Sequence, residues 1–204
     1  MTKIDSTKTR LDERLSYLKL AYIRENYESL AKLAAQKQWT HVNYLTELIA
    51  AEANLKKDRA TKRRIRSARF PQIKTLDQFK WSWPKKVNQL QVKNLFRLKF
   101  IDEKSNVVLL GGVGLGKTHL SIALGYHACL KGYSVLFCSA VDAINNLVAA
   151  QTAGCLKQEM RKYHKPALVI IDELGYLPID KTGADYLFQI ISHRYEQGAK
   201  SQNN

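Results

Sequence analysis

The chain has 204 residues, of which 45% are hydrophobic and 25% charged, a composition typical of globular proteins and unlike that of disordered or fibrous chains. Residues 1–14 are too charged for a secretory signal, and no run approaches the roughly 18 apolar residues that a membrane span needs. We therefore expect a cytoplasmic protein with no membrane partner. The three cysteines show no paired spacing, which predicts reduced, mostly buried side chains rather than disulfides or a zinc site.

Charge and glycine are distributed unevenly along the chain. The net charge is +15, and residues 1–104 hold 24 basic and 11 acidic residues, a balance of +13, against 9 and 7 in residues 105–204, a balance of +2. All 10 glycines lie at or after Gly111. This pattern predicts a basic helical region followed by an α/β region. Positive charge concentrated in one half favours a polyanionic partner, for which nucleic acid is the usual candidate.

The first part of the chain predicts three helices. Apolar residues repeat at helical spacing from Thr9 to about residue 22 and again over residues 25–38. Thr40 is a suitable N-cap for a third, longer helix. Pro71 should end that helix, because proline disfavours helical geometry in the residue before it and cannot donate a backbone hydrogen bond.

The end of the third helix is strongly basic. Residues 56–69 contain eight basic residues against the single acidic Asp58. On a continuous helix, three- and four-residue steps place one set of side chains on a common face: Arg59, Lys62, Arg63 and Arg66. A solvated helical linker is one interpretation, and contact with nucleic-acid phosphates is the other; the uncompensated charge favours the second.

Residues 71–104 read as a linker with several aromatic residues. Trp81 and Trp83 lie next to a predicted turn at Pro84, and a helical stretch follows. Two interpretations are open: an apolar linker that packs beneath the second domain, or a surface in which Phe79, Trp81 or Trp83 lines a base pocket or stacks on nucleic acid.

A phosphate-binding motif follows the apolar segment 107–110, which we expect to be a short strand. The next residues match the pattern G-x-x-x-x-G-K-T, and a helical sequence follows. The motif consists of Gly111, Gly112, Val113, Gly114, Leu115, Gly116, Lys117 and Thr118. Its glycines let backbone N–H groups point at phosphates beside a helix N-terminus. Lys117 is predicted to reach the β- and γ-phosphates and Thr118 to bind Mg²⁺; a plain glycine-rich turn is the alternative.

A second apolar strand, expected at residues 167–171, ends in Asp172 and Glu173. Asp172 is predicted to hold Mg²⁺ through a water, and Glu173 to polarise the attacking water. An ordinary helix N-cap acid is the alternative. The paired acids favour nucleotide hydrolysis over phosphoryl transfer to a small molecule. A strand at 134–138 and helices at 141–150 and 183–197 complete the prediction, and the scattered histidines predict no metal cluster; His119 is interpreted as packing.

The segments NVVLLGGVGLGKTHLSIALGYHA, LVIIDELGYLP and ISHRYEQG resemble the IstB-like transposition helper ATPases, which are relatives of the DnaC-type helicase loaders in the AAA+ class. The resemblance extends through the N-terminal region and linker. It implies a P-loop AAA+ parallel sheet flanked by helices, with ATP and Mg²⁺ bound, Lys117 and Glu173 catalytic, and ATP hydrolysed. It also implies self-association of ATP-bound subunits on double-stranded DNA and a transposase partner. The phosphate loop lacks the proline usual in the family, which should loosen it.

The end of the sequence departs from the family pattern. After the helix containing R-Y-E, the family has a further apolar strand with a polar residue, an arginine that reaches a neighbouring subunit, and a helical lid. Residues 198–204 show no such strand. We therefore expect an incomplete, C-terminally truncated ATPase whose central sheet lacks a strand.

These observations predict a basic helical domain at 1–70, a linker at 71–104 and a P-loop ATPase domain at 105–204. The predicted function is that of an ATP-dependent helper that presents target DNA to a transposase. The alternatives are a helicase loader, which would bind a helicase through the N-terminal region, and a remnant that binds ATP and DNA without turnover.

Overall fold

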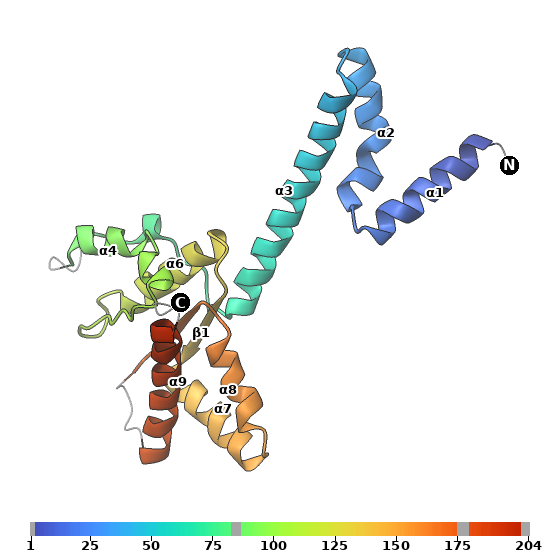
Figure 1. Ribbon diagram of the computed structural model, residues 1–204. Helices are drawn as coiled ribbons and strands as arrows, with labels where there is room; N and C mark the ends of the chain where they lie inside the picture. Colours follow the sequence, from blue (N-terminus) through green and yellow to red (C-terminus); the bar gives the residue numbers. More distant parts are fainter. Residues whose placement is uncertain (1–2, 83–86, 175–179, 201–204) are drawn as a thin grey trace. The chain divides into compact units, whose positions relative to one another are not determined.

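The computed structural model describes residues 3–82, 87–174 and 180–200. The chain divides into two compact units, residues 1–62 (unit 1) and 63–204 (unit 2). No described helix is both long and apolar enough to cross a membrane. The prediction of a basic helical region followed by a parallel sheet flanked by helices is confirmed (Figure 1).

Unit 1 is helical. It contains α1 (Lys3–Tyr17), α2 (Ala21–Gln36) and the first part of α3 (His41–Ala68). Thr40 caps α3 as predicted, because its Oγ1 accepts a hydrogen bond from the backbone N–H of Asn43 at 3.2 Å. The three helices meet around a small apolar cluster with a core of Leu15, Ile23 and Leu48.

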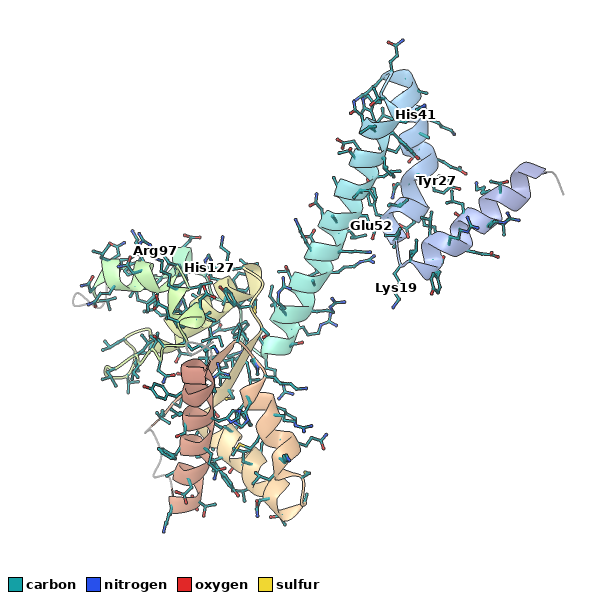
Figure 2. The ribbon with its side chains drawn as sticks, in the orientation of Figure 1. Lys19, Tyr27, His41, Glu52, Arg97 and His127 are labelled. Carbon is teal, nitrogen blue, oxygen red and sulfur yellow. The ribbon has the colours of Figure 1, made fainter. Side chains whose placement is uncertain are left out.

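Glu52 joins α3 to the start of α2 (Figure 2). Its side chain is only 3% exposed, and Oε2 accepts hydrogen bonds from the backbone N–H groups of Tyr22 at 2.8 Å and Ile23 at 3.2 Å. Leu20, the N-cap residue of α2, has no side chain that can cap. Glu52 therefore supplies the cap from another helix and places a carboxylate at the positive end of α2.

Unit 2 contains a parallel two-stranded sheet. Strand β1 (Val135–Ser139) pairs with β2 (Leu168–Asp172), in a register that places Val135 opposite Leu168 and Ser139 opposite Asp172. Both strands lie one residue later than predicted. Helices α7 (Ala140–Thr152) and α8 (Leu156–His164) connect them, and α9 (Lys181–Lys200) follows β2. The sequence had indicated α7 and α9 but not α8.

Alternate strand residues face two apolar clusters, which gives unit 2 a layered arrangement. Val135 of β1 packs with Leu124 and Ala128 of α6 (Lys117–Leu130), whereas Leu136 packs with Leu147 of α7 and residues of α8 and α9. Because successive side chains of a strand point to opposite faces, α6 covers one face of the sheet and α7–α9 the other.

The linker forms η1 (Leu76–Gln78), α4 (Gln89–Leu95) and α5 (Lys99–Asp102). Helix α3 ends at Ala68, before Pro71 as predicted, and the next residue, Arg69, has a left-handed φ of 61°. Trp83 and the predicted turn at Pro84 lie outside the described residues.

The predicted strand at residues 107–110 is wrong. These residues have no regular secondary structure, and the side chains of Val108 and Leu110 are 71% and 90% exposed. In the described ranges, the sheet consists of β1 and β2 alone, so no strand pairs with this segment. A strand forms through hydrogen bonds to a neighbour, and apolar composition alone cannot supply them. Only Leu109 turns inward, against Phe79, Val92 and Leu120.

Replacing Glu52 with alanine should destabilise unit 1, because the part-buried N–H of Tyr22 and the buried N–H of Ile23 would both lose their acceptor. We expect a loss of about 2 kcal/mol in local stability, and therefore roughly 30-fold faster hydrogen exchange in α2. Hydrogen–deuterium exchange of α2 peptides measures this effect. The matched control is Glu47→Ala, an exposed residue of the same helix. Equal exchange rates in both variants would contradict the capping role.

Candidate functional site

The glycine-rich segment 111–118 leads directly into α6, which begins at Lys117. Gly116 is the N-cap of α6 and has a left-handed φ of 83°, which glycine adopts without strain. A Cβ at this position would lie 2.6 Å from Cε2 of Phe79. Both the backbone conformation and the packing therefore require glycine. The N–H groups of the first turn of α6 are directed towards the loop.

The Lys117 side chain folds over the loop that precedes it. Its Nζ donates hydrogen bonds to the backbone carbonyls of Gly111 at 2.8 Å and Gly112 at 2.6 Å. The amine is therefore held within the segment that the motif assigns to phosphates.

Phe79 packs its ring against Gly116 at the end of the loop. Its side chain is 8% exposed and makes edge-on contacts with the rings of Trp81 and His119, at centroid distances of 4.9 and 5.5 Å. His119 Nε2 lies 2.9 Å from the carbonyl oxygen of Thr75. These contacts confirm that the linker packs against the second region and that His119 is a packing residue. Phe79 is too buried to offer an open surface on which a base could stack.

The structure brings three of the predicted site residues to one cavity. Thr118, Asp172 and Glu173 line a cavity of about 770 Å³, which is within the usual range for small-molecule sites. Asp172 is the last residue of β2, and Glu173 follows with a left-handed φ of 60°. The exposed Glu173 side chain borders the cavity.

Several other residues line the cavity that the sequence had not indicated as site residues. Ser139 Oγ accepts from the backbone N–H of Asp142 at 3.0 Å and so caps α7, a role that the S-x-x-D pattern could have revealed. Burial raises the pKa of Cys138 to about 11 and that of Tyr163 to about 12, so both are neutral at pH 7. The charged residues that line the cavity, including the two predicted acids, are Arg69, Asp142, Glu159, Lys162, Lys165, Asp172 and Glu173.

Arg194 fixes the connection between α8 and β2. Its Nη1 donates to the carbonyls of Tyr163 at 3.1 Å and Pro166 at 2.8 Å, and its Nη2 donates to that of Ala167 at 2.9 Å. Burial lowers the pKa of Arg194. The guanidinium thus holds the segment that enters β2, the strand that carries Asp172 at its far end.

The donor atoms suit Mg²⁺ better than a softer metal. Thr118 and Asp172 line the cavity and carry side-chain oxygens, and oxygen is the ligand that Mg²⁺ prefers. Among the described residues, no group of three or more His, Cys, Asp or Glu side chains could enclose a metal. A cation held by one carboxylate and one hydroxyl, with nucleotide phosphates and water completing its shell, fits this arrangement.

The basic residues predicted on α3 are not among the residues that line the cavity. Arg59, Lys62, Arg63 and Arg66 are all exposed, and none of them lines the cavity. In the part of the chain that the structure describes, their side chains make no ion pair. Arg64 differs, because its Nε donates to the carbonyl of Cys129 in α6 at 3.1 Å. The end of α3 therefore presents Arg63 and Arg66 outward while Arg64 attaches it to α6.

Comparison with known proteins identifies the family. Residues 13–201 match the family model described as IstB-like ATP binding protein. The chain is 36% identical over 189 residues to the ATP-binding protein of insertion sequence IS5376 from Geobacillus stearothermophilus, covering 93% of this chain and 75% of that protein. It is 34% identical to the ATP-binding protein of insertion sequence IS21 from Pseudomonas aeruginosa, covering 93% and 71%. The chain belongs to the family of IstB-like ATP-binding proteins found in insertion sequences.

Proposed function

We propose that the chain binds and hydrolyses ATP at the loop 111–118 and acts as an ATP-dependent helper of transposition on DNA. The observation that carries the proposal is the shared cavity of Thr118, Asp172 and Glu173, next to a glycine-rich loop at the N-terminus of α6. The names of the relatives, which are ATP-binding proteins of insertion sequences, favour transposition over helicase loading. A transposase is accordingly the proposed partner, with self-association of ATP-bound subunits.

Each residue of the site has a proposed role in hydrolysis. The backbone N–H groups of the loop and the first turn of α6 bind phosphate oxygens, and the Lys117 amine exchanges its two carbonyl contacts for the β- and γ-phosphates. Thr118 and Asp172 hold Mg²⁺, which supplies charge neutralisation when bound. The Glu173 carboxylate accepts a hydrogen bond from the attacking water and orients it. Arg194 keeps β2, and so Asp172, in place.

The proposed DNA contact is the exposed basic face of α3, formed by Arg59, Lys62, Arg63 and Arg66. The face extends over about 10 Å of helix, given a rise of 1.5 Å per residue. Lysine and arginine side chains without acidic partners attract phosphates independently of base sequence. This interpretation suits a helper that binds many target sites.

Removing the Lys117 amine should abolish ATP binding, whereas neutralising Glu173 should leave binding intact and stop turnover. The expected results are at least a 100-fold weaker Kd for Lys117→Ala, and a Kd within about twofold of the original for Glu173→Gln with a kcat at least 100-fold lower. Calorimetric titration with ATP and a phosphate-release assay, with and without duplex DNA, provide the measurements.

The same experiment separates the alternatives. Equal loss of ATP binding in both variants would contradict the assigned roles of Lys117 and Glu173. Binding of ATP by the unmodified chain without any phosphate release would favour the remnant interpretation over an active ATPase.

Reversing charge on α3 should weaken DNA binding at every sequence. With Arg63→Glu and Arg66→Glu combined, we expect the slope of log affinity against log salt to become shallower by about 2, because each phosphate contact contributes roughly 0.9. Fluorescence anisotropy with duplexes of unrelated sequence, over a salt series, measures the slope. Arg97→Glu with Lys99→Glu is the control, since both residues are exposed and lie outside α3; Figure 2 labels Arg97. An unchanged slope in the α3 variant would exclude this face.

A further inference from the structure

Helix α8 carries a second set of exposed basic residues, within the half of the chain that is nearly neutral. Lys157, Arg161 and Lys165 follow one another at four-residue steps over α8 and its C-cap, and all three are exposed. The opposite side of the helix is apolar, with Leu156, Met160 and Tyr163 packed against α7 and α9. Residues four apart lie on the same helical face, so the three cations form one line, the α8 stripe.

Most of the positive charge of α8 has no acidic partner. The single acid of the helix, Glu159, is paired with Lys162 one turn away. Across the residues that the structure describes, the side chains of the α8 stripe make no ion pair with an acid. Four of the nine basic residues in 105–204 fall between positions 157 and 165. The balance of +2 for this half therefore conceals a locally basic surface.

The stripe has the form of a phosphate-binding surface. Its three cations extend over about 12 Å at a rise of 1.5 Å per residue. The exposed positions of α8 hold lysine, arginine and glutamine, without an aromatic side chain on which a base could stack. Point charges of this kind contact backbone phosphates and do not read base edges. Arg194 holds the C-terminal end of the helix, which keeps the line of charges in a fixed position.

We propose that the α8 stripe of Lys157, Arg161 and Lys165 binds the phosphate backbone of duplex DNA, as a second contact distinct from the α3 face. The proposal rests on the DNA-binding function proposed above. Lys165 also lines the cavity that contains Asp172 and Glu173. DNA bound to α8 would therefore lie beside the candidate nucleotide site, with α8 between the DNA and the nucleotide.

The test replaces all three residues with glutamine, which keeps helix propensity and removes three charges. For Lys157→Gln, Arg161→Gln and Lys165→Gln combined, the expected result is a salt slope shallower by 2 to 3, at roughly 0.9 per contact, and at least tenfold weaker binding at low salt. The matched control is Lys93→Gln, Arg97→Gln and Lys99→Gln, which removes two lysines and one arginine, all exposed, from the linker helices and their connection. Its slope should change by less than 1.

Several results would overturn the proposal. The first is an unchanged slope of log DNA affinity against log salt in the triple variant, and the second is an equally large change of slope in the control variant. If the unchanged slope is accompanied by lost binding to polyglutamate, the stripe would be assigned to an acidic protein instead. Thermal melting by circular dichroism checks folding. If the triple variant does not fold, Lys157→Gln alone should reduce the slope by about 0.9. Absence of any salt-dependent DNA binding by the unmodified chain refutes both proposals. Loss of slope in the α3 variant but not in the α8 variant refutes this one alone.

Discussion

The close packing of α6 against its neighbours is the constraint on which the rest of unit 2 depends. A Cβ at Gly125 would lie 2.7 Å from Cδ1 of Ile170 in β2 and 2.9 Å from Cε1 of Phe70, so a larger residue would require these side chains or the helix itself to shift. The small residues Ala123 and Ala128 are fully buried around it. The glycine-rich loop leads directly into the first turn of α6. The position of the loop relative to β2 and Asp172 therefore depends on how closely α6 approaches the sheet.

The parts of the fold that depend on neighbouring residues could be predicted from the sequence. The cap at Thr40, the end of α3 before Pro71 and the strand that ends in Asp172 all follow from local chemistry, and each is confirmed. The features that depend on distant residues could not be predicted. Glu52 caps a helix thirty residues earlier in the chain, and the segment 107–110 is strand-like in composition but has no hydrogen-bonded neighbour in the described residues.

The candidate site shows the same division. The spacing of the motif and the acids after an apolar strand indicated Thr118, Asp172 and Glu173, and the cavity contains all three. Their assigned chemistry and the domain boundaries at 70 and 104 stay predictions. Arg69 and Lys165 border the cavity because helices α3 and α8 end beside β1 and β2, an arrangement that only tertiary structure determines. The net charge of residues 105–204 also gave no sign of the basic surface on α8, because the basic residues of that helix are offset by acidic residues elsewhere in this half.

The contacts of Lys117 determine what its amine can contribute to affinity. Two carbonyls, those of Gly111 and Gly112, already accept hydrogen bonds from Nζ at 2.8 and 2.6 Å. In the proposed site, an incoming phosphate would exchange these bonds for its own, so the net gain in binding free energy would be the difference between charge-assisted bonds to phosphate and bonds to neutral carbonyls. The binding free energy gained from this exchange should differ between nucleoside diphosphates and nucleoside triphosphates. A nucleotide with fewer phosphates would leave Lys117 Nζ bonded to the loop carbonyls. The carbonyls of Gly111 and Gly112 would then compete with phosphate oxygens for the hydrogen bonds of this lysine.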